Sequence, residues 1–386
     1  MKKSLLLALS KYNPIPETLR GTHIGQTVND LDVDLAGLYH HYYMDNYGIE
    51  PPSPDPAQFE YLRFLMPDTD FRFQGGGLTI STSARRSTST QLGQAFCRWF
   101  MHEHLGIKYF AHMGSLIGTH SPSFHGFAVE RSQPGDTPDY LCSAGLGSVA
   151  VAEAKGRYTP INFKNKEFDS WRQQFTRIRV LDKTGTPVSV KGHIVATRFA
   201  TEYRARVDSK LYAEDPITEG QEPISQQTEA LLSKQIAASH YADVLLKLDQ
   251  PHMSHALRNQ LSMESQIRIT ATIWEFSLGK LESKLFVGGY HGGRPDHQLI
   301  ELVDDQIVHH RSDLFRLGAH SGTFVGLELS VFKHLVQVCR GADRLLEDSM
   351  PEVNSVDGVY SGVSMLRDGS IIGPLPFFNP SRLALF

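Results

Sequence analysis

Residues 138–158 read PDYLCSAGLGSVAVAEAKGRY, and this stretch decides the fold. It contains two apolar runs joined by a turn with Gly145 and Gly147, a pattern that favours a hairpin of two strands. Residues 148–154 are small and β-branched, which is typical of a strand buried in the centre of a sheet. The sequence therefore predicts a hairpin whose second strand belongs to the core.

Three charged side chains are expected at one end of this hairpin. Because the side chains of a strand alternate between its faces, Glu153 and Lys155 lie on one face and Ala154 on the other. Asp139, at the mouth of the first strand, then lies beside them. Carboxylate oxygens suit Mg²⁺ or Mn²⁺, and a lysine can hold or polarise an attacking water. The alternative is a surface hairpin with an ordinary Glu–Lys pair.

The motif resembles the signature of the PD-(D/E)xK nuclease superfamily, which has the restriction-endonuclease-like fold. The dipeptide at 138–139 matches PD, and EAK at 153–155 matches (D/E)xK. The resemblance covers about residues 88–205. It implies a mixed α/β (α+β) protein with a restriction-endonuclease-like αβββαβ core, to which N-terminal and C-terminal regions are added.

The resemblance also implies roles for these residues. Asp139 and Glu153 would hold one or two Mg²⁺ or Mn²⁺ ions, and the Ala154 carbonyl would be a further metal ligand. Lys155 would orient the attacking water or stabilise developing negative charge. Phosphodiester hydrolysis needs such a site because the water must become nucleophilic and the charge on the phosphate must be neutralised.

Helices on either side of the motif supply further candidates. Many nucleases of this superfamily carry a glutamine on the helix after the ExK strand, so Gln173 or Gln174 is a candidate catalytic residue that contacts the substrate. The two point about 100° apart on a helix, so at most one should face the site, and solvent exposure is the alternative. Glu103 is a further candidate for the metal site, although an exposed glutamate near a helix end is favoured.

The hydrophobic pattern predicts the elements of the core. A helix over 91–105 is expected to begin at Ser89 or Thr90 and to end at Gly106. The other elements follow in chain order: strands over 107–113 and 124–131, the two strands of the hairpin, a helix over 168–179 that begins at Asp169 or Ser170, and a strand over 188–199.

We divide the chain into three parts: an N-terminal region of unknown role (1–87), a nuclease-like domain (88–212) and a C-terminal α+β domain for partner or substrate binding (213–386). Residues 75–90 are predicted to be a boundary loop. The segment YHHYYM at 39–44 fits a metal site or a base-stacking surface, but packing of a helix into the core is favoured. The C-terminal part should be mainly helical over 213–262, contain a helix-like run at 327–347 within residues 322–347, be strand-like over 267–293, and form a hairpin near 367–370.

Composition limits the partners. A net charge of −4 over 386 residues is not that of a general nucleic-acid binder, so DNA binding requires a local basic patch. The candidate arginines are Arg85, Arg86, Arg172, Arg177, Arg179, Arg198, Arg204 and Arg206. Three widely spaced cysteines fit a reducing cytoplasm. The apolar run at 5–9 is too short for a signal peptide, and no segment approaches the about 20 apolar residues of a membrane span.

The sequence therefore predicts a cytoplasmic, Mg²⁺-dependent phosphodiesterase. We expect an endonuclease that cuts DNA, in a bacterial antiphage defence or DNA-processing system, with a possible protein partner and no membrane. The first alternative is a non-catalytic nuclease-like scaffold subunit of a nucleic-acid-binding complex, although an intact Asp–Glu–Lys set argues against it. The second is a metal-independent binding or sensor protein in which EAK is accidental.

Overall fold

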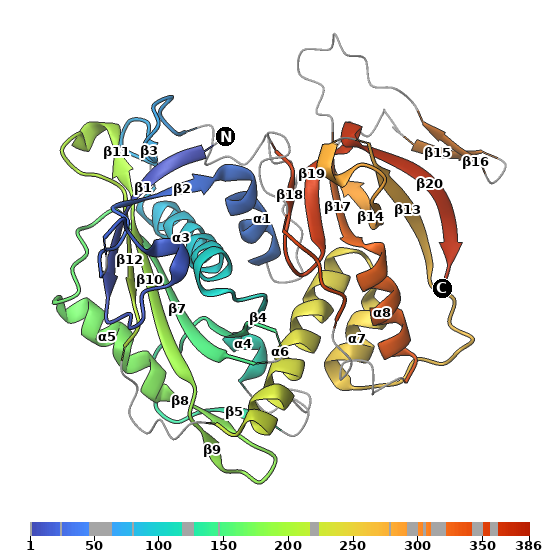
Figure 1. Ribbon diagram of the computed structural model, residues 1–386, viewed down its shortest axis with the longest axis horizontal. Helices are drawn as coiled ribbons and strands as arrows, with labels where there is room; N and C mark the ends of the chain where they lie inside the picture. The colour runs from blue at the N-terminus through green and yellow to red at the C-terminus, as the bar shows by residue number, and fades with distance from the viewer. Residues whose placement is uncertain are drawn as a thin grey trace.

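The computed structural model has two lobes, each built on its own sheet (Figure 1). It describes residues 2–23, 25–45, 64–78, 81–117, 127–145, 147–216, 224–277, 279–291, 300–303, 306–309, 322–341, 350–355 and 362–386. The first lobe covers the described residues up to 216, and the second lobe covers those from 224 onward.

Seven strands form the sheet of the first lobe. They are β1 (Lys2–Ser10), β2 (Asp30–Asp34), β4 (Tyr109–His112), β6 (Tyr140–Ser143), β7 (Val149–Arg157), β10 (Lys191–Arg198) and β12 (Lys210–Glu214). Their order across the sheet is β2-β1-β12-β10-β7-β6-β4. β4, β6 and β7 are successive antiparallel neighbours, so the predicted hairpin is present, and β10 lies parallel to β7.

Helices cover both faces of this sheet. α1 (Leu35–Asp45) packs on α3 (Thr82–Leu105), which crosses β7, whereas α5 (Lys166–Gln174) provides the crossover between the parallel strands β7 and β10. The approach of α3 to β7 requires glycine, because a Cβ atom on Gly156 would overlap the Ser89 carbonyl oxygen. On the α5 face, the Arg157 guanidinium lies 5.0 Å from the ring centroid of Trp171.

Short elements complete the first lobe. β5 (Ala128–Arg131), β8 (Ile178–Leu181) and β9 (Pro187–Val188) form a small sheet, β3 (Arg72–Phe73) pairs with β11 (Ala200–Thr201), and α4 (Met113–Leu116) follows β4.

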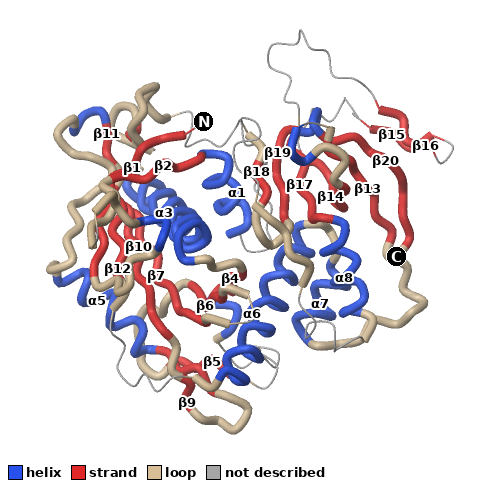
Figure 2. Tube along the Cα trace, viewed as in Figure 1, coloured by secondary structure: helices blue, strands red, loops and turns tan. Residues whose placement is uncertain are grey.

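The second lobe holds a six-stranded antiparallel sheet with helices packed beside it (Figure 2). Its strands are β13 (Thr270–Phe276), β14 (Leu285–His291), β17 (Thr323–Glu328), β18 (Ser364–Met365), β19 (Ser370–Pro374) and β20 (Phe378–Leu385), in the order β18-β19-β17-β14-β13-β20. The remaining elements are α6 (Gln226–Lys247), α7 (Pro251–Asn259), α8 (Leu329–Cys339) and the pair β15 (Ile300–Val303) and β16 (Gln306–His309). α6 packs against β4 and β6 as well as α7, and one apolar core runs through both lobes.

The mixed helix and strand class expected from the sequence is confirmed, but several boundaries differ. α3 begins at Thr82, so residues 82–90 are helical and not a loop. The polar first turns of α3 carry no apolar period and therefore gave no helical signal. Ser89 and Thr90 lie inside the helix, where their hydroxyls donate to the Arg86 carbonyl. Gly106 ends the helix in a left-handed conformation, as predicted.

The division between residues 87 and 88 also falls inside α3. β1 and β2 belong to the same sheet as β7 and β10, so the described residues of the predicted N-terminal region share a fold with residues 88–212. The division between 212 and 213 falls within β12, at the end of the first lobe.

Other elements end earlier or later than expected. The predicted helix over 168–179 is α5, which begins at Lys166, and residues 178–181 form β8 instead. The strand over 188–199 begins at Lys191. Of the strand over 124–131, residues 124–126 lie outside the described residues, and β5 pairs with β8 outside the large sheet. The helix-like run over 327–347 is present as α8, which begins at Leu329 after β17, and residues 342–347 lie outside the described residues. The hairpin near 367–370 joins β18 to β19.

The helices in the described part of the chain do not have the length and apolar character of a membrane span. None of them is both long enough and apolar enough to cross a membrane.

Candidate active site

The pairing of β6 with β7 brings Asp139 next to Glu153. Tyr140 lies opposite Ala152, and the Asp139 amide donates to the Ala152 carbonyl at 3.0 Å, so the preceding aspartate comes opposite the glutamate. Asp139 Oδ2 accepts a hydrogen bond from the Ala154 amide at 2.8 Å. The aspartate is thereby fixed to the edge of β7 by both its backbone and its side chain.

Lys155 completes the group. Its Nζ forms an ion pair with Glu153 Oε1 on the same face of β7. The Lys155 side chain is 28% exposed and the Glu153 side chain is 0% exposed, so the lysine covers the glutamate and faces the solvent. The alternation of β7 therefore brings the three predicted side chains together.

Glu153 is buried, and the charged groups that act on it are Asp139 and Lys155. Among the described residues, neither of its carboxylate oxygens accepts a hydrogen bond of regular geometry. Burial, and then the neighbouring Asp139, raise the pKa of Glu153 well above its usual value. Burial also raises the pKa of Asp139, although Lys155 and the Ala154 amide act in the opposite direction. Burial lowers the pKa of Lys155, but the charge of Glu153 outweighs it and the net shift is upward.

The donor atoms at this site fit a hard divalent cation. Two carboxyl groups, those of Asp139 and Glu153, lie together, and within the described part of the chain Lys155 is the cation that pairs with Glu153. A strand residue directs its N–H and C=O to the same side, so the Ala154 carbonyl faces the Asp139 side as its amide does. Gln94 Nε2, from α3, donates to Asp139 Oδ1 at 3.3 Å and so orients the second carboxylate. Asp139, Glu153 and Ala154 are therefore the residues that could hold the metal.

The two glutamines after the motif differ in position. Gln174 is buried, and its Oε1 lacks a hydrogen-bond partner within the described part of the chain. Gln173 is exposed and lines a cavity of about 500 Å³, together with Val151. Val151 precedes Glu153 by two residues on the same face of β7. Within the described residues, no hydrogen bond or ion pair joins either glutamine to Asp139, Glu153 or Lys155.

Several arginines proposed for a basic patch have partners inside the protein. Arg172 holds Glu214 with Nη2 2.8 Å from Oε2 and also pairs with Asp169, so it fixes α5 to β12 rather than facing a ligand. Arg177 donates to the Asp136 carbonyl and Arg198 to the Asp208 carbonyl. The members of the predicted set that are exposed are Arg86, Arg179, Arg204 and Arg206.

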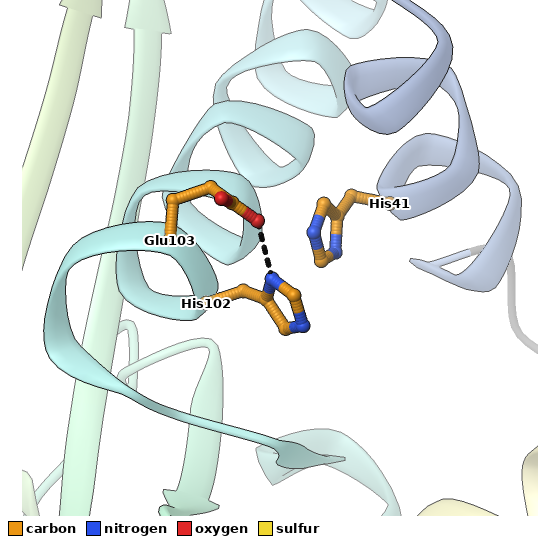
Figure 3. Close-up of side chains that lie close together, drawn as sticks. All are labelled: His41, His102 and Glu103. Atoms are coloured by element: carbon orange, nitrogen blue, oxygen red, sulfur yellow. Dashed lines mark hydrogen bonds and ion pairs between the residues drawn. The ribbon is translucent and has the colours of Figure 1, made fainter. Parts of the chain in front are cut away.

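A second cluster of ligand-type side chains lies elsewhere on α3. His41, His102 and Glu103 meet where α1 packs on α3 (Figure 3). The YHHYYM segment is thus a buried helix, as favoured, but one of its histidines also belongs to a possible metal cluster. Glu103 pairs with His102 and lies nine residues, or about 13 Å along the helix, beyond Gln94, which contacts Asp139. Glu103 therefore does not extend the site at β7.

Comparisons with known proteins give no further identification. No protein-family model, no curated protein and no solved structure matches this chain.

Proposed function

We propose that this protein is a Mg²⁺- or Mn²⁺-dependent nuclease with its active site at Asp139, Glu153 and Lys155. The observation that carries the proposal is the burial of Glu153 beside a second carboxyl group, Asp139, with the Lys155 ammonium as the only cation paired with it among the described residues. Such a carboxylate is costly to ionise, and a divalent cation shared with Asp139 would offset that cost.

The chemistry follows from these groups. Asp139 and Glu153 would hold a divalent cation as carboxylates, and that cation would supply a lowered pKa for a bound water and neutralisation of charge on the phosphate. Lys155, released from its ion pair, would donate to the attacking water or to a phosphate oxygen, where negative charge develops. In the hydrolysis the water oxygen would form a bond to phosphorus as the bond from phosphorus to the leaving oxygen breaks, and the proton lost by the water would pass through solvent to the leaving oxygen.

The order of elements supports the same proposal. The succession α3, β4, β6, β7, α5 and β10 has three antiparallel strands followed by a helix and a parallel strand, which agrees with an αβββαβ core. By the resemblance to PD-(D/E)xK nucleases, DNA is the proposed substrate, cut internally. A role in antiphage defence or DNA processing, with a protein partner, belongs to the same proposal.

One observation favours a second candidate, a non-catalytic scaffold with a nuclease-like core. Lys155 already neutralises Glu153, and Arg172 and Arg177 are engaged within the protein. The same lobe would then bind nucleic acid or a partner protein without cutting it.

A cleavage assay tests the proposal. Purified protein is incubated with supercoiled DNA, linear DNA and single-stranded RNA, in Mg²⁺, Mn²⁺ or EDTA. We expect metal-dependent cutting of DNA by the wild type and a loss of at least about 100-fold in Glu153→Gln and Asp139→Asn, because each loses a direct metal ligand. Glu130→Gln, which changes an exposed carboxylate on β5, is the matched control and should cut normally.

The outcomes separate the candidates. Undiminished cutting by both Glu153→Gln and Asp139→Asn would contradict the proposed site. Metal-independent binding of DNA by a wild type that never cuts would favour the scaffold. Circular dichroism of each variant shows whether a loss of cutting reflects the site or a loss of folding.

A further inference from the structure

The contact between α1 and α3 gathers three ligand-type groups from two helices. One ligand atom each from His41, His102 and Glu103 lies within 4.8 Å of the other two. His102 Nδ1 is 2.6 Å from Glu103 Oε1, and the rings of His41 and His102 meet edge to face with 5.0 Å between their centroids. Figure 3 shows the carboxylate and both rings turned toward one another.

His41 has an unexplained feature. Its side chain is 1% exposed, and neither ring nitrogen has a hydrogen-bond partner among the described residues. A buried polar atom without a partner is destabilising unless something satisfies it. Burial, and then the charges of His102 and Arg98, lower the pKa of His41 well below its usual value. The ring is therefore neutral near pH 7, which leaves a nitrogen lone pair available.

We propose that His41, His102 and Glu103 bind a divalent transition metal of the Zn²⁺ type. Two imidazole nitrogens and one carboxylate oxygen suit Zn²⁺ and its neighbours, whereas Mg²⁺ prefers oxygen donors alone. Three protein ligands leave a fourth position for water, and the 27% exposed Glu103 side chain gives the ion a route of entry. This site is separate from the one at Asp139, because Gln94 and His102 are about 12 Å apart along α3.

The site is also connected to the second lobe. Two donors of Arg367 lie close to His102 Nε2. The backbone amide nitrogen of Arg367 is 3.4 Å from it, and the guanidinium Nε of Arg367 is 3.2 Å from it. These donors require that the proton of His102 be on Nδ1, where it is shared with Glu103. A metal on Nδ1 moves that proton to Nε2, so no proton is released, but Arg367 can no longer donate there. Metal binding thus clamps α1 to α3 and displaces Arg367 from His102.

The charged groups around the cluster act on a bound cation in opposite directions. Burial raises the pKa of Glu103, but the hydrogen bond and charge of His102, followed by Arg367, hold it below its usual value, so the carboxylate is ionised near pH 7. Arg98 is paired with Asp45 and is partly neutralised. The guanidinium of Arg367 is the group that opposes the metal most directly.

The test uses the full chain, stripped of metal with EDTA and dialysed. Co²⁺ is titrated and followed by its visible absorption, and Zn²⁺ is then added to displace it. We expect one Co²⁺ per chain with a spectrum of four-coordinate Co²⁺, full displacement by Zn²⁺, and a rise in melting temperature with Zn²⁺. Glu103→Gln, which keeps the shape of the side chain, should weaken binding at least about 10-fold, as should His41→Asn.

Control variants separate this site from others. His104→Gln alters a neighbouring histidine whose Nδ1 lies 2.9 Å from the Thr18 hydroxyl, and it should bind Co²⁺ like the wild type. Glu153→Gln should also leave Co²⁺ binding unchanged, so a failure of the nuclease proposal does not affect this result. Arg367→Met should tighten binding, because it removes the opposing charge.

The outcomes that would overturn the proposal are specific. They are a wild-type chain that binds no Co²⁺ or Zn²⁺, a Glu103→Gln and a His41→Asn variant that both bind as the wild type does, or an Arg367→Met variant that binds more weakly. Because Glu103 is partly exposed, Glu103→Gln is expected to fold, and its melting temperature without metal checks this.

Discussion

Glu153 in the first lobe and Asp368 in the second are both buried carboxylates, but their surroundings are opposite. Asp368 accepts hydrogen bonds from His240 Nε2 at 2.7 Å and from the amide and hydroxyl of Ser370 at 2.8 and 2.6 Å. Burial raises the pKa of Asp368, but these bonds outweigh it and lower the pKa below its usual value. Glu153 lies between the Lys155 ammonium and a second carboxyl group, that of Asp139, and its pKa is raised.

The difference follows from local structure. Asp368 lies in the turn between β18 and β19, where the Ser370 amide is free to donate to a side chain. Glu153 lies within β7, where ladder bonds between strands occupy the backbone amides. A buried carboxylate in a turn can be satisfied by the fold and stabilise it, whereas one in a central strand depends on a partner side chain or a cation. We therefore interpret Asp368 as structural and Glu153 as suited to ligand binding.

The strongest test of this comparison removes each carboxylate. Asp368→Ala should lower the free energy of unfolding by about 3 kcal/mol, because His240 and Ser370 lose a buried partner. Glu153→Gln should change it by no more than about 1 kcal/mol, or raise it, because a buried charge is removed. Urea unfolding measures both. A larger loss in Glu153→Gln than in Asp368→Ala would reverse the interpretation.

A second test changes the packing of β7 against α3 and leaves Glu153 unchanged. Gly156→Ala places a methyl group against the Ser89 carbonyl, so α3 or β7 must shift, at a cost of about 2 kcal/mol. Thermal or urea unfolding measures the loss. Gly114→Ala is the control, because a Cβ atom at Gly114 would meet open space, and it should cost less stability than Gly156→Ala. Gly145→Ala is not a suitable control, because Gly145 has a positive φ of 98°. Equal losses in Gly156→Ala and Gly114→Ala would show that the close contact does not matter.

The third test uses pH, because the pKa of Glu153 is raised and that of Asp368 is lowered, so the two groups change the stability in opposite directions as pH rises. A carboxyl group with a raised pKa binds more protons when folded, so stability falls as pH rises from the ordinary pKa toward the raised one. The loss for Glu153 is about 1.4 kcal/mol for each unit by which its pKa is raised. Asp368, with a lowered pKa, contributes stability above its ordinary pKa and loses it as pH falls below that value.

Buried histidines with lowered pKa values, among them His40, His41 and His193, act in the opposite direction over this pH range, so the comparison is made with Glu153→Gln. We expect the wild-type unfolding free energy, measured by urea in EDTA, to fall from pH 5 to pH 8 relative to that of Glu153→Gln. Mg²⁺ should restore the wild type more at pH 8, because the ionised carboxylates bind it. A pH dependence that is identical in the wild type and in Glu153→Gln would count against a raised pKa at Glu153.

The smallest effects are expected for the two glutamines. Gln173→Ala should leave stability within about 0.5 kcal/mol, since the residue is exposed, and Gln174→Ala should lower it by about 1 kcal/mol, since the residue is buried. In the cleavage assay, Gln173→Ala should reduce cutting more than Gln174→Ala, because Gln173 lines the cavity next to β7. The reverse order of cutting would assign the substrate contact to Gln174.

Part of this structure could be predicted because its causes are local. The period of two along β7 puts Glu153 and Lys155 on one face, the glycine-rich turn returns the chain to Asp139, and Gly106 ends α3 with a positive φ of 71°. Each of these follows from the backbone preferences of a few neighbouring residues. Local patterns do not determine which distant groups meet.

The rest depended on packing between residues far apart in the chain. The polar first turns of α3 show no hydrophobic period. β1 and β2 pair within the large sheet, and the strand beside β1 on its other side, β12, lies about 200 residues further along the chain. The sequence around Arg172 predicts a surface cation, but Arg172 donates to the carboxylate of Glu214, which is 42 residues away in the chain. The sequence by itself determined which charged groups share the edge of β7. The burial of Glu153 beside Asp139, and the meeting of His41 with His102 and Glu103, came from tertiary packing, because burial and helix packing depend on the whole fold.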